Sequence, residues 1–432
     1  MLQLGLHSVI VGFALFSMLF GAGNVIFPPY VGLTAGPEWV IGFLCYYMAD
    51  VGLALVAVFA MLRTQSIDKV EGIMSRLGYI PAKLMIAVMV ICIGPLLAMP
   101  RTCATTFSLA IVPLIGTDSV YVSVLFAGLF FALTFLFSYK ESTLVDLVGR
   151  YLTPLLVFGL LMMIVLGFIS PIGPISDSPK IENIAWMSIS AGYQTLDVLA
   201  MVIFGILIVN ALKAKGYSTP KLKFISVGAA SLVAGLLLFV VYGGLCYLGA
   251  TASTLYPDNI DKGQLVLGIS SRVFGWEGSV ILSLIIALAC LTTAIALAGA
   301  AGTFFSTLTN GKWSYKFVII VVCAFSAVVS NFGLNNIIAL AAPILTVLYP
   351  GVLAVIFLSL FDNKIKNDNV FRSAALGAMA VSFCEVMGWY WPEAFAFVKY
   401  LPFQQPGFGW IVPAAVFALL GSFIRPSNNN NV

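Results

Sequence analysis

A run of residues near the front of the chain, FSMLFGAGNVIFPPY (16–30), holds groups that could bind an ion or a small molecule. The run is apolar enough to lie in a bilayer, yet Gly21, Gly23 and Asn24 occupy its middle and two prolines follow. Glycine lowers the cost of leaving helical backbone angles, and proline removes a helix hydrogen bond. We therefore expect the helix to break around these residues. Lipid cannot pair the freed N–H and C=O groups, so they must face protein or a watery cavity, as in the broken helices of secondary transporters.

Two adjacent hydroxyl groups form the second candidate feature. Thr292 and Thr293 lie in an apolar run that ends in the small residues AGAAG (298–302). In a helix these hydroxyls can simply bond to carbonyls one turn earlier, and for an isolated pair that structural interpretation is preferred. Hydroxyl and unwound backbone carbonyl oxygens also coordinate small cations in transporters. The broken first run would supply such carbonyls, which favours an ion site.

The third feature is the polar stretch SISAGYQTLD (188–197), which begins another apolar run and is followed by Phe204 and Gly205. If the first ten spans form two five-span repeats of opposite topology, this run and the first are equivalent elements. Interrupted segments at corresponding positions point to a binding site at the midplane. Gly205 has two equally weighted interpretations, a role in such a site or close packing between helices.

Charged side chains inside the apolar runs are further candidates, because charge is costly in lipid and therefore faces the bundle or a cavity. They are Asp50, Arg101, Arg150, Asp197 and Glu385. Arg101 could steer a carboxylate substrate, or form a structural pair with Asp197 or Glu385. Asp50 has no partner that the sequence identifies, and it could relay protons or bond to neighbouring helix ends.

The other reactive side chains indicate structural roles. Asp146 and Arg150 have the spacing of an ordinary helix ion pair. The seven cysteines fall in apolar runs without CxxC spacing, so we interpret them as small buried hydrophobes. With a single histidine, His7, and scattered carboxylates, the chain lacks the clustered groups of an enzyme. No organic cofactor, metal-dependent catalysis or nucleic-acid partner is expected.

Composition predicts a polytopic membrane protein. Of the 432 residues 61% are hydrophobic and only 9% are charged, far below the roughly 25% charged residues of soluble domains. A spanning helix needs about 20 apolar residues. We expect twelve spans, at about 6–33, 38–62, 79–113, 119–138, 143–170, 188–212, 223–250, 278–307, 315–331, 335–361, 371–391 and 408–425.

The placement of the positive charges orients this array. With a cytoplasmic N-terminus, most of the 21 lysines and arginines fall in inner loops, as the positive-inside rule requires. We therefore expect both termini in the cytoplasm and one membrane domain over 1–425. Its first repeat covers about 6–170, its second about 188–361, and two more helices about 371–425. The tail, 426–432, is expected to be disordered.

Four motifs together resemble a known family. They are FALFSMLFGAGNVIFPP (13–29), GPLLAMPRT (94–102), GYQTLDVLAMVIFG (192–205) and ACLTTAIAL (289–297). The chain is similar in these motifs to the bacterial branched-chain amino acid:cation symporters of the BrnQ type. That resemblance implies an all-α fold like that of the leucine transporter: twelve transmembrane helices, an inverted 5+5 repeat with helices 1 and 6 interrupted, and two further helices.

The resemblance also implies a substrate site. In such folds the substrate carboxylate meets backbone N–H groups at the break of helix 1, here Gly21, Ala22 and Gly23. Orphan N–H groups and the positive end of a half-helix dipole suit an anion. Phe204, beside Gly205, would flank the pocket for an apolar side chain.

For sodium, the resemblance implies a site between helix 1 and helix 8. The matching oxygens are the carbonyls of Ser17, Phe20 and Ala289 and the hydroxyls of Thr292 and Thr293. Some relatives bind a second sodium through an asparagine like Asn24 and a threonine of helix 6. This chain has Leu199 at that threonine position, which argues against a second ion, so Asn24 would instead bind substrate or cap the break.

We therefore expect an importer of leucine, isoleucine and valine in the bacterial inner membrane, coupled to sodium and working by alternating access. A proton-coupled carrier that uses Asp50, Asp197 or Glu385 is the main alternative, and another small amino acid could be the substrate. Membrane lipid is the only expected surrounding partner, and no protein partner is evident.

Overall fold

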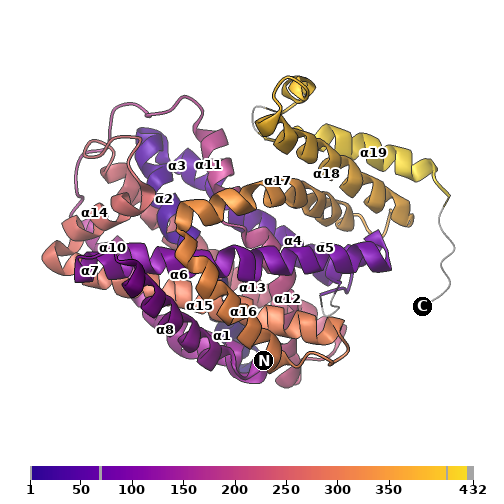
Figure 1. The fold of residues 1–432 in the computed structure, drawn as a ribbon, viewed down its shortest axis with the longest axis horizontal. Coiled ribbons are helices and arrows are strands. Elements are labelled where there is room, and N and C mark those ends of the chain that lie inside the picture. The colour runs from indigo at the N-terminus through magenta and orange to yellow at the C-terminus, as the bar shows by residue number, and fades with distance from the viewer. Residues whose placement is uncertain (1, 68–70, 405–406, 426–432) are drawn as a thin grey trace.

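The computed structural model describes residues 2–67, 71–404 and 407–425, so the expected disordered tail at 426–432 lies outside the described residues. The described chain is a bundle of helices, most of them joined by short connections (Figure 1). The α-helices are α1 (Leu2–Leu19), α2 (Ala22–Ala35), α3 (Trp39–Tyr47), α4 (Leu53–Arg63), α5 (Tyr79–Ile91), α6 (Ala98–Thr106), α7 (Val112–Ile115), α8 (Val120–Ser138), α9 (Glu141–Leu147), α10 (Thr153–Ile169), α11 (Ile184–Tyr193), α12 (Asp197–Ala214), α13 (Pro220–Thr251), α14 (Lys262–Phe274), α15 (Gly278–Leu308), α16 (Tyr315–Val329), α17 (Leu334–Ser359), α18 (Asp368–Tyr390) and α19 (Ile411–Phe423).

The helices have the lengths that a bilayer requires. Within the described residues, nine helical stretches are long and apolar enough to cross a membrane. Three apolar helices in the described residues are shorter, Gly5–Leu19, Pro343–Ser359 and Ile411–Phe423. The stretches agree closely with the expected spans in the middle of the chain, for example Val120–Ser138 against 119–138.

The first expected span is broken, as the sequence predicts. The helix α1 ends at Leu19, Gly21 has extended backbone angles (φ −102°, ψ −160°), and α2 begins at Ala22. The half-helix α2 packs closely on α13. A Cβ added to Gly32 would lie 1.8 Å from the carbonyl oxygen of Cys246, and the two helices therefore meet backbone to backbone.

The sixth expected span is also broken, between α11 and α12. Three residues separate the two helices, and Leu196 adopts a left-handed conformation (φ +72°), which is uncommon for a residue with a side chain. The polar stretch found in the sequence therefore contains the break. Gly205 lies inside α12, where a Cβ would meet Met61 and Ile67.

The third expected span bends just before Arg101. A π-helical turn, Cys92–Leu96, contains Pro95, and the backbone leaves helical angles at Gly94 and Leu97 before α6 begins. Pro100 lies inside the first turn of α6, where proline is tolerated. Further π-helical turns hold Asp50 (Met48–Gly52) and precede Thr153 (Val148–Leu152). Such turns are frequent at functional sites.

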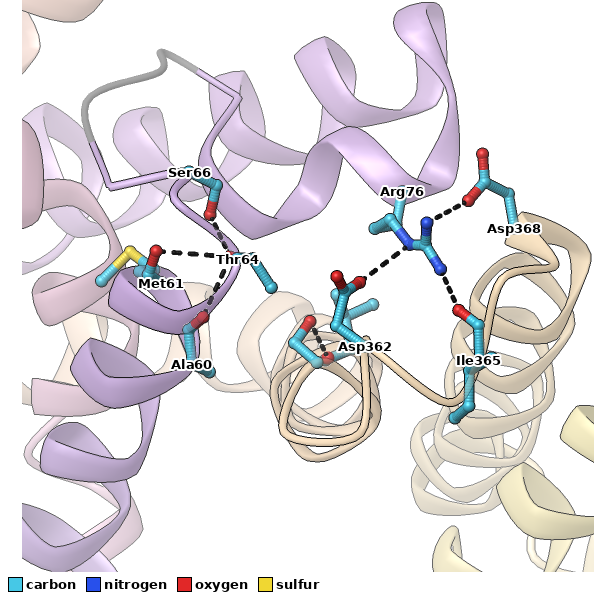
Figure 2. Close-up of polar contacts among 10 residues, drawn as sticks. Ala60, Met61, Thr64, Ser66, Arg76, Asp362, Ile365 and Asp368 are labelled. Atoms are coloured by element: carbon cyan, nitrogen blue, oxygen red, sulfur yellow. Dashed lines mark hydrogen bonds and ion pairs between the residues drawn. The ribbon is translucent and has the colours of Figure 1, made fainter. Parts of the chain in front are cut away.

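The last two helices, α18 and α19, lie side by side at one edge of the bundle (Figure 1). One arginine connects the start of α18 to an earlier connection. Arg76 forms ion pairs with Asp362 (3.4 Å) and Asp368 (2.9 Å) and donates a hydrogen bond to the carbonyl of Ile365 (Figure 2). The segment before α5 is therefore attached to the connection between α17 and α18.

Candidate functional site

The break between α1 and α2 is capped by a side chain. The backbone N–H of Gly21 donates to Asn24 Oδ1 (3.2 Å) and to the carbonyl of Leu19 (2.8 Å). Asn24 is thus the capping residue that the sequence left as one of two options. Because the Gly21 N–H is already paired, the N–H groups of Ala22, Gly23 and Asn24, in the first turn of α2, are the ones without a helical acceptor.

The amide nitrogen of the same asparagine joins three other elements. Asn24 Nδ2 donates to Asp197 Oδ2 (2.8 Å) and lies 3.4 Å from Asp50 Oδ2. It also makes a short contact with the hydroxyl of Tyr242 in α13. The two carboxylates, which are remote in sequence, therefore meet across one amide at the two helix breaks.

Both carboxylates are shielded from the exterior. Asp50 is 0% exposed and Asp197 is 4% exposed. Thr195, in the break between α11 and α12, donates to Asp50 Oδ1 (2.8 Å). The hydroxyl of Tyr46, one helical turn before Asp50, is buried without a hydrogen-bond partner among the described residues. Burying charge is costly unless it is paired, so this cluster is a place where charge must be balanced.

The two hydroxyls expected to bind sodium, those of Thr292 and Thr293, both lie near the Ser17 carbonyl in α1. Thr292 Oγ1 lies 3.1 Å from the Ser17 carbonyl and Thr293 Oγ1 lies 3.3 Å from it. Thr292 also bonds back to the carbonyls of Leu288 (2.9 Å) and Ala289 (3.0 Å). The Thr292 hydroxyl therefore bonds to carbonyls one turn earlier, as the structural interpretation predicts, and it also approaches α1. Phe20 lies in the break itself, one residue past α1.

One further oxygen was not identified from the sequence. Thr153, the first residue of α10, donates from Oγ1 to Ser17 Oγ (2.7 Å) and is fully buried. It follows the π-helical turn Val148–Leu152, which alters the helical register before it. The hydroxyls of Ser17 and Thr153 thus lie beside the carbonyl that Thr292 and Thr293 approach. No charged group contributes to this set of oxygens.

Arg101 is placed at the first break. Its Nη1 donates to the carbonyl of Gln194 (3.2 Å), at the second break, and its guanidinium lies 5.8 Å from the ring centre of Phe27. A Cβ on Gly23 would lie 3.0 Å from Arg101 Nη2. Among the described residues, neither Asp197 nor Glu385 forms the ion pair with Arg101 that was considered as an alternative.

A small cavity lies between the two breaks. Its polar wall comes from the first turn of α2, from α6, from the second break and from α15; the residues are Gly21, Ala22, Gly23, Asn24, Arg101, Thr102, Thr195, Asp197 and Thr293. Its apolar wall consists of Met18, Leu19, Ile93, Ala98, Leu196, Ala200, Phe204 and Leu297. The cavity thus combines both signs of charge with a wall of aliphatic and aromatic carbon.

Three candidates from the sequence lie elsewhere. Gly205 is not part of the cavity lining, and Glu385 lies half-buried in the peripheral α18. The expected ion pair between Asp146 and Arg150 is wrong. Asp146 instead accepts from Lys215 Nζ (2.7 and 2.9 Å), and Arg150 is exposed. The π-helical turn at Val148–Leu152 shifts the four-residue spacing on which that expectation depended.

The architecture is shared with solved structures of other chains. The chain shares its fold with a nucleobase-cation-symport-1 family transporter, Mhp1, with bromovinylhydantoin bound (TM-score 0.58, 14% identity, covering 96% of this chain and 91% of that one). It is also similar to MhsT in complex with L-phenylalanine (TM-score 0.53, 17% identity, covering 95% and 97%). The expected leucine-transporter-like fold is therefore confirmed as a fold.

Sequence comparison identifies the family. Residues 5–428 match the model of the family described as "Branched-chain amino acid transport protein", and the chain belongs to this family. It is 32% identical to the branched-chain amino acid permease BrnQ of Bacillus subtilis, over 96% of each chain. It is 34% identical to the permease BraB of the same organism, over 98% of this chain and 97% of that one. The chain is thus a multi-pass membrane protein of a transporter family, and the family is not one of enzymes.

Proposed function

We propose that the protein imports leucine, isoleucine and valine by sodium-coupled symport and alternating access. The observation that carries this proposal is the convergence of Thr292 and Thr293 on the Ser17 carbonyl, next to the cavity at the helix break. Neutral hydroxyl and carbonyl oxygens suit a monovalent cation. The apolar wall suits an aliphatic side chain, and relatives named as branched-chain amino acid permeases supply the substrate class.

A sodium ion at these oxygens would hold the end of α1 and so fix the position of Ala22 and Gly23, which meet the substrate. Ion and amino acid would then bind cooperatively, and by linkage each would raise the affinity for the other equally. The apolar wall separates side chains only weakly, since one methylene is worth about 1–3 kcal/mol. The three aliphatic amino acids are therefore expected to share the site.

The remaining parts of the proposal concern topology. The twelve spans, arranged as two inverted repeats of five with two helices after them, would lie in the bacterial inner membrane with both termini in the cytoplasm. The two broken spans, α1–α2 and α11–α12, are the pair expected at equivalent positions of such repeats. The charge of the connecting segments supports the orientation.

The test is uptake of radiolabelled leucine into proteoliposomes, with an inward sodium gradient or with choline in place of sodium at fixed pH. We expect uptake only with sodium, and its loss in the double variant Thr292→Ala/Thr293→Ala. Thr134→Ala is the matched control, because this buried hydroxyl only bonds back to Phe130 in α8. Equal uptake with sodium and with choline would contradict the proposal.

Proton coupling is the second candidate, because Asp50 and Asp197 are buried together at the breaks. A pair of carboxylates in one buried site favours the binding of a proton. An inward pH gradient without sodium separates the two mechanisms. Leucine uptake under that condition, and its loss in Asp50→Asn, would favour the carboxylates as the coupling site.

A further inference from the structure

The guanidinium of Arg101 is a buried cation with unused donors. The residue is 8% exposed and lines the cavity. Of its five N–H groups, the only described acceptor is the Gln194 carbonyl, bonded by Nη1. No carboxylate lies within ion-pair distance among the described residues. A buried charge without a partner costs free energy, so an anion in the cavity would stabilise this arrangement.

The carboxylate of Asp197 is the opposite charge on the same cavity. It is the first residue of α12, and its described hydrogen bond comes from Asn24 Nδ2 (2.8 Å). The Asp50 carboxyl group also lies within hydrogen-bonding reach of Asp197. Since a carboxylate can accept about four hydrogen bonds, Asp197 still has capacity for a further donor in the cavity that it lines. Asp50 differs from it: Asp50 accepts from Thr195 (2.8 Å) and is not part of the cavity lining.

The ionisable groups that act on Asp197 come from five other elements. Arg101 is on α6, Asp50 is on the π-helical turn after α3, and the phenols are Tyr46, Tyr242 and Tyr349, from α3, α13 and α17. Arg101 is the only cation in this group. The cavity therefore presents one basic and one acidic side chain, both buried and both able to make further hydrogen bonds.

We propose that Arg101 and Asp197 recognise the two ends of an amino acid zwitterion. Arg101, together with the N–H groups of Ala22 and Gly23, binds the α-carboxylate, and Asp197 accepts the α-ammonium group. Bonds between ionised groups are stronger than those between neutral ones, and guanidinium geometry matches a carboxylate. The proposal rests on amino acid transport being the function, and it adds how the site selects that class of substrate.

This arrangement predicts a discrimination that does not depend on the side chain. A molecule with leucine's side chain but only one charged end leaves either Arg101 or Asp197 unpaired in the cavity. The resulting penalty is that of an unsatisfied buried charge. Leucinamide lacks the carboxylate and 4-methylpentanoate lacks the ammonium group, so each is expected to compete weakly with leucine.

The experiment measures competition against radiolabelled leucine bound to the purified full-length protein in sodium buffer. For Arg101→Gln we expect the affinity for leucine to fall on the order of 10- to 100-fold while the affinity for leucinamide stays unchanged. For Asp197→Asn we expect the same loss for leucine and an unchanged affinity for 4-methylpentanoate. Arg101→Lys is expected to restore part of the affinity for leucine, because the charge is kept and the planar geometry is lost.

Arg150→Gln is the matched control, because Arg150 is also an arginine within an apolar run but is exposed and outside the cavity. It is expected to bind all three ligands as the wild type does. An equal loss for leucine and leucinamide in Arg101→Gln would overturn the role of Arg101. The Asp197→Asn series tests the other end even if Arg101→Gln does not fold. Wild-type protein that fails to bind leucine would instead refute the amino acid substrate, and so the proposed function itself.

Discussion

The hydroxyl of Thr195 lies 2.8 Å from Oδ1 of Asp50 and connects the break between α11 and α12 to the π-helical turn that follows α3. On the other side of Asp50, Asn24 belongs to the half-helix that follows the first break. Asp50 is therefore bonded to both interrupted spans, although it lies in neither. The relationship makes the two breaks parts of one polar cluster.

Removal of this hydroxyl is expected to destabilise the protein. In Thr195→Val the Asp50 carboxylate would lose this 2.8 Å hydrogen bond, while its 3.4 Å contact with Asn24 would remain. An unsatisfied buried acceptor costs about 1–3 kcal/mol, so we expect a lower Tm for the purified protein. Thr195→Ser keeps the donor and should melt close to the wild type. An equal Tm for the valine variant and the wild type would show that the hydrogen bond between Thr195 and Asp50 contributes nothing to stability.

Substitution of Thr153 is expected to change the apparent affinity for sodium more than the apparent affinity for the amino acid. Its hydroxyl bonds to Ser17 Oγ, beside the oxygens of Thr292 and Thr293. For Thr153→Val we expect the sodium concentration for half-maximal leucine uptake to rise several-fold, with uptake near normal at saturating sodium. A titration of uptake against sodium measures this. A variant that changes the half-saturating concentration of leucine alone would contradict the assignment.

The size of Phe204 is expected to set the upper limit on the substrate side chain. Phe204 is fully buried and forms part of the apolar wall. Phe204→Leu shortens that wall without adding a polar group. We expect phenylalanine to compete better against labelled leucine, by about 5- to 10-fold in relative affinity, since apolar contacts are worth about 1–3 kcal/mol per methylene. An unchanged relative affinity for leucine and phenylalanine would show that the substrate side chain does not contact Phe204.

Close packing of α2 on α13 can be tested at a glycine. A Cβ on Gly249 would lie 1.9 Å from the carbonyl oxygen of Pro29. Gly249→Ala is therefore expected to destabilise the protein by about 1–3 kcal/mol or more, visible as a lower Tm in detergent. Gly128→Ala is the control, because nothing lies within 4 Å of a Cβ at that exposed site in α8. Identical melting of the two variants would argue against the backbone contact.

Arg76 is expected to restrain local opening more than global stability. Its partners Asp362 and Asp368 are partly exposed, so these ion pairs contribute little free energy each (Figure 2). In Arg76→Gln we expect faster amide hydrogen exchange in Gly72–Leu77 and little change in Tm. Exchange in α8, far from the contact, serves as the internal reference.

The first break could be predicted because its cause is local. Glycine and proline act on their own backbone, so the residues around Gly21 reveal it in the sequence. The second break is less direct, because Leu196 takes a left-handed conformation without the glycine that usually marks it. Its polar neighbours indicated an interruption, whereas Gly205, the residue singled out there, lies inside α12.

The partners of the buried charges could not be predicted. Asn24, Asp50 and Asp197 are far apart in the chain, and only the packed helices bring them together. The prediction that Asp146 pairs with Arg150 was wrong for a local reason, because a π-helical turn cannot be recognised from residue spacing. Thr153 was missed because a single threonine at the start of a long apolar helix resembles any other.

The contact between α2 and α13 also limits how the molecule can move. The backbones touch at two levels, Gly32 against Cys246 and Gly249 against Pro29, so α2 cannot slide along α13 without a collision. We therefore expect the two helices to travel as one rigid body. The hinge would then be the extended backbone at Gly21, where α1 ends. Probes placed on α2 and α13 should keep a constant separation with and without sodium and leucine, whereas a pair placed across Gly21 should not.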